Sequence, residues 1–209
     1  MAWYKLDEEG NIEGLLKPLA PLINYVARLN GTDQYWQLSE AISIGSSNFA
    51  LRLKVTTSFS GSQVHLTDSP EDFYFKIFIT SNGIPSVLFG DGSQWVYSLN
   101  AVTNIADSKE HSIEVVKNSG QLYLLVDGVI EFQRDELTQV FAGIEFIGVR
   151  NSLSQYFNGS VYDFEVEINN TLTHSIPLTN KAQGSTQLAT VGSVNATMVG
   201  YDESVWEQA

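Results

Sequence analysis

Acidic residues alternate along one short segment, which could gather several carboxylates for acid–base chemistry. If the sequence Asp163-Phe164-Glu165-Val166-Glu167 is a β-strand, its three carboxylates share one face, with neighbours ~7 Å apart and the outer pair ~13 Å apart. Retaining glycoside hydrolases require two carboxyl groups only ~5–5.5 Å apart. The spacing therefore favours an acidic outer face and no catalysis. The opposite, buried face would consist of Tyr162, Phe164, Val166 and Ile168.

A second group of residues could bind sugars, because glycan sites combine apolar ring faces with a few fixed polar side chains in a concave surface. Trp95 and Tyr97 are two residues apart and follow Asp91-Gly92 closely. A strand would place both rings on one face. We predict a glycan-binding set of Asp91, Trp95 and Tyr97. The alternative for the two rings is core packing, which is the more common role of aromatic residues at a period of two.

The other reactive residue types show no catalytic arrangement. The histidines, His65, His111 and His174, are far apart in sequence and lack the spacing of metal ligands. The chain has no Ser/His/Asp arrangement, no phosphate-binding glycine loop and no nucleotide-binding motif. The sequence therefore predicts a protein that is not an enzyme.

Charge and composition exclude several classes of partner and site. The 209 residues include 24 acidic and 11 basic ones, a formal net charge of -13, with no basic cluster that could neutralise phosphates. Nucleic acids and anionic membrane surfaces are therefore not expected partners. The chain has no cysteine, which excludes disulfides and thiolate metal sites. It also has no apolar run near the ~20 residues that span a bilayer and no secretory signal at its start.

Short runs of alternating apolar and polar residues fill most of the chain, and turn signals separate them. This is the pattern of half-buried antiparallel strands. In one run Leu51 and Leu53 should face inward and Arg52 outward, and Asp127-Gly128 supplies the positive φ angles of a two-residue hairpin turn. Up to ten such strands and little helix predict an all-β, two-sheet antiparallel jelly-roll sandwich.

The first pair of strands should be Tyr25–Arg28 and Tyr35–Leu38, forming a hairpin around Asn30-Gly31-Thr32. Within the second strand of this pair, Tyr35 and Trp36 are adjacent and should face opposite sides of the sheet. One ring should then be in the core and the other exposed.

Several runs also resemble a known domain. Leu122–Gly128 reads Leu-Tyr-Leu-Leu-Val-Asp-Gly, and Phe157–Val166 reads Phe-Asn-Gly-Ser-Val-Tyr-Asp-Phe-Glu-Val. These motifs resemble the second half of a laminin-G-like domain of the concanavalin A-like lectin/glucanase superfamily. The resemblance covers roughly residues 22–170 and implies the same sandwich fold. Its motifs belong to the fold and not to catalysis.

The resemblance carries two further implications about sites. Glucanases of the superfamily order their acids as Glu-x-Asp-x-(x)-Glu with tryptophans nearby, and Asp-x-Glu-x-Glu at residues 163–167 departs from that order. Laminin-G-like domains often hold Ca²⁺ at the sandwich rim through acidic side chains and backbone carbonyls. Loops where such a rim could form contain Asp68, Asp72, Asp91 and Asp107. No cofactor is predicted beyond this optional calcium.

The residue pattern at the two ends of the chain differs from the alternating pattern of its middle. Residues 1–21 are predicted to be an N-terminal arm, which either packs on its own sandwich or docks on another subunit. The apolar residues available for such assembly are Trp3, Tyr4, Leu15, Leu16 and Leu19. The sandwich itself is assigned to residues 22–170 and a C-terminal extension to residues 171–209. The end of that extension, from Asn195 to Trp206, resembles tails that follow such sandwiches in bacteriophage virion proteins.

Together these features predict a non-enzymatic structural or adhesive protein, as a bacteriophage virion surface component in capsid decoration or the tail, with glycan binding. The alternative is a stand-alone carbohydrate-binding module, and a glucanase-like glycoside hydrolase ranks third. Expected partners are other virion proteins and cell-surface or environmental glycans, and a homo-oligomer is expected because symmetric assemblies are common. The expected location is the virion, assembled in the host cytoplasm, with an extracellular location as the alternative.

Overall fold

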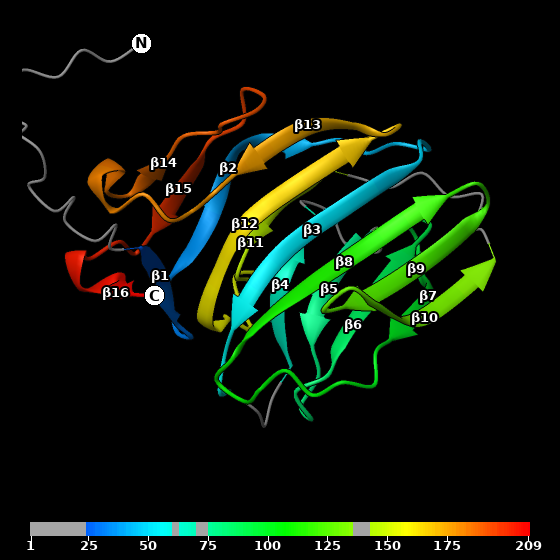
Figure 1. Cartoon of the computed structure of the whole chain (residues 1–209), viewed down its shortest axis with the longest axis horizontal. Helices are drawn as coiled ribbons and strands as arrows, with labels where there is room; N and C mark the ends of the chain where they lie inside the picture. The colour runs from blue at the N-terminus through cyan, green and yellow to red at the C-terminus, as the bar shows by residue number, and fades with distance from the viewer. Residues whose placement is uncertain (1–23, 60–62, 70–74, 136–142) are drawn as a thin grey trace, which may run out of the picture.

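The computed structural model of the chain describes residues 24–59, 63–69, 75–135 and 143–209, and all of its longer elements are β-strands (Figure 1). These ranges contain no α-helix and only two short 3-10 helices, η1 (Lys181–Gln183) and η2 (Glu203–Val205). Nothing in them is a helix long and apolar enough to cross a membrane. The all-β prediction is confirmed.

The strands form two antiparallel sheets that pack face to face, as the jelly-roll prediction requires. Sheet A has the order β10 (Val129–Asp135), β9 (Gln121–Val126), β8 (Glu110–Asn118), β3 (Phe49–Thr56), β12 (Asn158–Ile168), β1 (Tyr25–Asn30) and β16 (Trp206–Gln208), with β13 (Thr171–Ile176) also paired to β12. Sheet B has the order β14 (Thr186–Gln187), β15 (Ala196–Val199), β2 (Tyr35–Ile42), β11 (Ile144–Ile147), β4 (Val64–Asp68), β5 (Phe75–Ile79), β6 (Pro85–Gly90) and β7 (Trp95–Asn100).

The core lies between the two sheets and follows the predicted alternation. In β3, Leu51 and Leu53 are buried, while Arg52 between them reaches the outer face of sheet A. Phe49 of the same strand meets Phe75 of sheet B edge to face, with ring centroids 6.3 Å apart. Burial of such apolar surface is the main stabilising term of a sandwich, so these alternating strands determine which face of each sheet turns inward.

The Asp127-Gly128 turn joins β9 and β10 as predicted. Asp127 has φ 52° and Gly128 has φ 75°, which are the left-handed angles of a type I′ hairpin turn. The turn is also held from outside, because the Asp127 carboxylate accepts the backbone N–H of Ser112 at 2.8 Å. β10 then forms one edge of sheet A.

The predicted first hairpin is wrong. β1 pairs with β12 and β16 in sheet A, whereas β2 pairs with β11 and β15 in sheet B. The connection between β1 and β2 therefore carries the chain from one sheet to the other. Leu29 before it and Trp36 after it are both fully buried. Leu29 points into the core from sheet A and Trp36 points into it from sheet B, so both side chains are buried.

The prediction that one of the adjacent rings in β2 is exposed is also wrong. Trp36 is 0% and Tyr35 only 7% exposed. Tyr35 points away from the core as alternation requires, but the rings of Phe146 and Tyr156 cover it, each with its centroid 6.2 Å from the Tyr35 ring. Local alternation gives the direction of a side chain and not what lies over it.

Residues 171–209, predicted as a C-terminal extension, contribute strands to both sheets. β13 and β16 join sheet A, while β14 and β15 join sheet B. In Figure 1, β14, β15 and β16 lie near β1 at the left of the sandwich, whereas β13 lies beside β12 at the top. The predicted arm, residues 1–21, and its assembly residues Trp3, Tyr4, Leu15, Leu16 and Leu19 lie outside the described residues.

Candidate functional site

Strand β1 changes its pairing partner halfway along, and this opens space on both of its sides. Tyr25, Val26 and Ala27 pair with β16, whereas Arg28, Leu29 and Asn30 pair with β12. Among the described residues, each half of β1 thus has one edge to which no strand is bonded. Side chains that line those edges have room for a ligand beside them.

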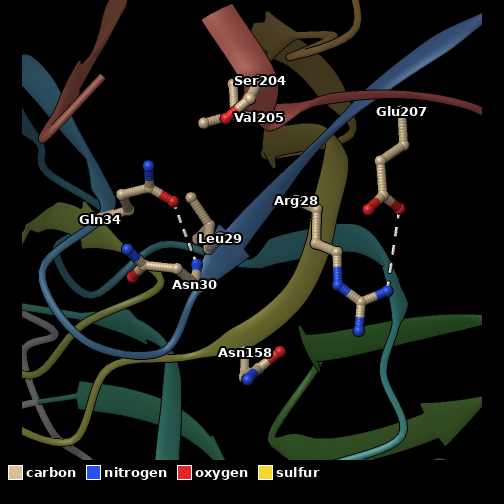
Figure 2. Close-up of a pocket in the computed structure, with 8 residues that line it drawn as sticks. All are labelled: Arg28, Leu29, Asn30, Gln34, Asn158, Ser204, Val205 and Glu207. Carbon is tan, nitrogen blue, oxygen red and sulfur yellow. Dashed lines mark hydrogen bonds and ion pairs between the residues drawn. The ribbon is translucent and has the colours of Figure 1, made fainter. Parts of the chain in front are cut away.

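A cavity of about 460 Å³ lies beside the second half of β1 (Figure 2). It is formed by β1, the start of β12, the loop before β2 and the segment from η2 to β16. We call it the β1 cavity. Its lining consists of Arg28, Leu29, Asn30, Gln34, Asn158, Ser204, Val205 and Glu207.

The loop that forms one wall of the β1 cavity is fixed by its own side chains. The Asn30 side-chain oxygen accepts the N–H of Thr32 at 2.9 Å, an Asx turn that holds the start of the loop. Gln34 then ties the loop in two directions. Its oxygen accepts the Asn30 N–H at 3.1 Å, and its amide nitrogen donates to the Gly200 carbonyl, also at 3.1 Å. The wall is therefore largely preformed.

Other polar groups of the β1 cavity remain available to a ligand. Within the described part of the chain, the Asn158 carboxamide has no hydrogen-bond partner, while the Asn158 backbone carbonyl accepts from the Thr57 hydroxyl at 2.6 Å. Arg28 and Glu207 are 3.8 Å apart with side chains 40% and 52% exposed, so their pair is weak and solvated. A guanidinium, a carboxamide and a carboxylate together offer donors and acceptors in planar arrays that suit hydroxyl-rich ligands.

The predicted acidic strand is ion-paired. Asp163 is 3.0 Å from Lys54, and Glu167 is 2.9 Å from Arg52, which is also 2.7 Å from Glu114. A register shift between Tyr162 and Glu165, together with φ 49° at Asp163, interrupts the alternation. Asp163 and Glu167 thus act as partners of neighbouring cations on β3.

The predicted buried face of this strand is largely confirmed. Tyr162, Phe164 and Val166 are all buried, and Ile168 is partly buried against the core. Because of the register shift, Tyr162 pairs with Lys54, and its hydroxyl donates to Glu110 at 2.5 Å. Burial and the neighbouring Glu110 carboxylate raise the pKa of Tyr162 to about 12. The phenol therefore stays a neutral donor on the outer side of sheet A.

The structure separates the predicted glycan-binding residues from one another. A register shift in the β6–β7 pair lies between the positions of Trp95 and Tyr97, so the expectation of one shared strand face is wrong. Lys76 lies over the Trp95 ring at 4.4 Å, while Arg134 of sheet A lies over the Tyr97 ring at 3.9 Å. Cations of the chain itself thus cover one face of each ring.

Asp91 is engaged in the turn that precedes β7. Its side-chain oxygen accepts the backbone N–H groups of Ser93 and Gln94, both at 2.9 Å, and the Ser93 hydroxyl at 2.7 Å. Hydrogen bonds from the Ser93 hydroxyl and from the two backbone N–H groups lower the pKa of Asp91 to about 2. Neither Asp91 nor the two rings line the β1 cavity.

The aspartates considered for calcium lie in separate networks. Asp68 accepts from Ser69 N–H at 2.9 Å and contacts His65 at 3.1 Å, and Asp91 holds its own turn. Asp107 contacts His111, and Asp72 lies outside the described residues. No group of three or more His, Asp or Glu side chains suited to a metal ion occurs in the ranges that the structure describes. Calcium at the rim stays a prediction.

His111 is a structural residue that joins two loops. Its Nδ1 is 2.8 Å from Asp127 and its Nε2 is 3.0 Å from Asp107. Burial opposes the charged imidazolium, but the hydrogen bonds to Asp127 and Asp107 outweigh burial and raise the pKa of His111. Hydrogen bonds from the Lys109 N–H and from His111 lower the pKa of Asp107. This Asp–His–Asp contact fastens the loop before β8 to the β9–β10 turn.

The sequence did not identify the residues of the β1 cavity. Asn30 and Asn158 were visible as the first residues of two Asn-Gly turn signals. Their proximity depends on the β1–β12 pairing, in which they are direct partners. Glu207 reaches the site only because β16 pairs with β1, a contact that no local motif announces.

Comparison with known proteins finds solved structures with a similar fold but no matching family. No protein-family model matches the chain, and no curated protein matches it. A crystal structure of a candidate carbohydrate-binding protein from Bacteroides ovatus is similar, with TM-score 0.66 and 13% identity over 89% of this chain and 60% of that one. This chain therefore spans less than two thirds of that protein.

Two further solved structures share the sandwich. The Ruminococcus gnavus IT-sialidase CBM40 bound to α2,3-sialyllactose has TM-score 0.52 and 13% identity, over 69% of this chain and 91% of that one. Domains LG4–5 of the mouse laminin α1 chain have TM-score 0.53 and 11% identity, over 81% of this chain and 48% of that one. At such identities the likeness shows the fold alone. It supports the jelly-roll sandwich, which the laminin LG4–5 domains and the CBM40 share.

Proposed function

We propose that this protein is a non-enzymatic glycan-binding sandwich and that the β1 cavity holds the sugar. The observation that carries the proposal is the lining of this cavity, where a preformed wall stands opposite the unbonded Asn158 carboxamide and the loosely paired Arg28 and Glu207. Planar polar groups of this kind fix the orientation of a polar ligand in a concave site. Support also comes from a CBM40 of the same fold that is bound to α2,3-sialyllactose and from a candidate carbohydrate-binding protein of that fold.

The arrangement of carboxylates supports binding without hydrolysis. Glycoside hydrolysis needs one carboxyl group free to donate a proton and a second free to act as nucleophile or base. On β12, Asp163 and Glu167 instead accept from Lys54 and Arg52. Among the described residues that line the β1 cavity, Glu207 is the one carboxylate.

The broader setting that we propose is the surface of a bacteriophage virion, in capsid decoration or the tail, where sugar binding would serve attachment. Support comes from the end of the chain, Asn195 to Trp206, which resembles virion-protein tails, and from the apolar arm at residues 1–21 as an assembly element. Other virion proteins and further copies of this chain would be its partners. A stand-alone carbohydrate-binding module is the second candidate, which the sugar-binding fold neighbours favour.

Glycan binding is tested by screening the full chain on a glycan array and measuring affinities by calorimetry. Replacing Asn158 by alanine removes one or two neutral hydrogen bonds to the sugar and should weaken binding about threefold to tenfold. The matched control Asn118→Ala, at the exposed end of β8, should leave the affinity unchanged. If Trp95→Ala abolishes binding and Asn158→Ala does not, the predicted β7 residues hold the sugar. If the full chain binds no glycan, the proposal fails.

The virion setting needs its own experiment. The protein should co-sediment with intact phage particles and appear in their mass-spectrometric inventory. Its absence from purified particles, with sugar binding intact, would leave the stand-alone carbohydrate-binding module.

A further inference from the structure

The β1 cavity is one of four cavities that adjoin along strand β1. A second cavity, of about 310 Å³, shares Arg28 and Glu207 with it. A third, of about 360 Å³, shares Val26, Glu110 and Tyr162 with the second. We call the continuous series the β1 groove.

The fourth cavity extends the groove past the beginning of β1. It has a volume of about 510 Å³ and shares Tyr25 and Thr179 with the third cavity. Lys181 of η1 lines its far side, with its ammonium 4.5 Å above the Tyr25 ring. The groove therefore begins at polar amides and ends at an aromatic ring.

The groove crosses the outer face of β1. Ala27 and Leu29 are buried in the core. Their neighbours in the strand, Val26 and Arg28, therefore point outward and line the middle of the groove. Its two ends lie on opposite edges of the strand, where the change of partner from β12 to β16 leaves each edge unpaired by any strand of the described ranges. A six-residue strand spans roughly 20 Å. This is long enough for several sugar residues in a row and too long for one.

The charges that line the groove cancel. Its cations are Arg28, Lys54 and Lys181, and its carboxylates are Glu110, Asp163 and Glu207. Lys54 is 3.0 Å from Asp163 and 3.7 Å from Glu110, and Arg28 is 3.8 Å from Glu207. The chain as a whole carries -13. An anionic sugar would find no surplus of positive charge in the groove and would be repelled by the rest of the surface.

We infer that the ligand of this site is a neutral, linear oligosaccharide chain that lies along the β1 groove, an inference that rests on the proposed glycan binding. The amides and the Arg28–Glu207 pair hydrogen-bond sugar hydroxyls at one end. At the other end the Tyr25 ring, which carries the Lys181 ammonium over one face, lines two of the cavities with the rest of its surface and offers that part to a sugar. The chain length and the absence of charge set this ligand apart from the α2,3-sialyllactose bound by the CBM40 neighbour.

The test is a calorimetric length series on the full chain. Cello-, laminari-, xylo-, manno- and chito-oligosaccharides of two and six residues are compared with α2,3-sialyllactose. The hexasaccharide of the preferred series should bind at least tenfold more tightly than its disaccharide, because additional sugars reach hydrogen bonds further along the groove. Sialyllactose should bind more weakly than either.

Two variants locate the chain in the groove. Tyr25→Ala should remove most of the gain between disaccharide and hexasaccharide while leaving disaccharide binding unchanged, and Tyr25→Phe should retain the gain. Asn158→Ala should weaken both lengths equally. Circular dichroism and unchanged melting temperatures exclude misfolding of each variant.

The outcomes distinguish failure of the groove inference from failure of the proposed glycan binding. If disaccharide and hexasaccharide bind equally, or if Tyr25→Ala leaves the gain intact, the groove inference is refuted while glycan binding stands. Tighter binding of sialyllactose than of every neutral chain refutes the charge argument, and its loss in Lys181→Ala would assign the sugar carboxylate to that residue. If none of these sugars binds and the array is also negative, the proposed function itself fails.

Discussion

Replacement of His111 by glutamine should destabilise the protein in a pH-dependent way. The imidazole lies between two carboxylates, 2.8 Å from Asp127 and 3.0 Å from Asp107, and its own side chain is only 10% exposed. Its pKa is raised in the folded protein because the hydrogen bonds to the two carboxylates outweigh burial. A histidine with a raised pKa stabilises the fold fully below its unfolded pKa of ~6.5, and this stability is lost as pH rises through the folded pKa.

The magnitude follows from the exposure of the Asp127 carboxylate. Charge-assisted hydrogen bonds contribute ~1.5–3 kcal/mol each when well shielded. The Asp127 side chain is 49% exposed, so solvent screening reduces the contribution of its hydrogen bond to ~0.5–1 kcal/mol. His111→Gln should therefore cost at least ~0.5–1 kcal/mol at pH 5.5, about 1–4 °C in melting temperature. At pH 9 the cost should fall to about half, because the neutral ring keeps one hydrogen bond.

The assay is thermal and urea unfolding of wild type and variant at pH 5.5 and pH 9. His174→Gln is the matched control. Burial lowers the pKa of His174, so its effect on stability should have the opposite pH dependence to that of His111. A lowered histidine pKa reduces stability at low pH, so removing this ring should help slightly at pH 5.5 and do nothing at pH 9. An equal loss from His111→Gln at both pH values would refute the ionic account of this contact.

Three further predictions concern the fold and assembly. Gly159→Ala should destabilise the protein by ~3 kcal/mol or more in urea unfolding, because a Cβ there would lie 2.3 Å from the Thr56 carbonyl oxygen. In the control Gly128→Ala the new Cβ has nothing within 4 Å, so only the left-handed backbone should cost ~1–2 kcal/mol. Equal losses from the two variants would contradict the clash at Gly159. Glu131→Gln should cost ~1–2 kcal/mol at pH 7, since this carboxylate accepts the N–H groups of the loop at residues 102–103. Hydrogen bonds from that loop outweigh burial and lower the pKa of Glu131, so the cost should shrink as pH falls through the lowered pKa; a loss that persists at pH 2 would contradict this. Deletion of residues 1–21 should convert an oligomer into a monomer by light scattering if the arm exchanges between subunits, and an unchanged mass would refute the arm as an assembly element.

Turn residues and apolar–polar alternation in the sequence determined the local features of this fold, namely its hairpin turn and the buried face of a strand. Asp127-Gly128 predicts the β9–β10 hairpin because its backbone angles are a local property. The alternation of β3 predicts its buried face, since side chains of a strand point to opposite sides whatever lies beyond them. These signals are sufficient for an all-β sandwich with a known type of turn.

Tertiary structure alone decided which strands meet, and with them the site. β1 pairs with β12 and β16, more than 100 residues away along the chain, and not with β2 as its turn residues suggested. Such pairing is chosen by which apolar faces can be buried together, a property of the whole chain and not of any segment. The bulges on β7 and β12 reversed local alternation for the same reason, separating Trp95 from Tyr97. The meeting of Asn30 and Asn158 in the β1 cavity is a consequence of that long-range choice, because only the β1–β12 pairing places these two turn residues side by side.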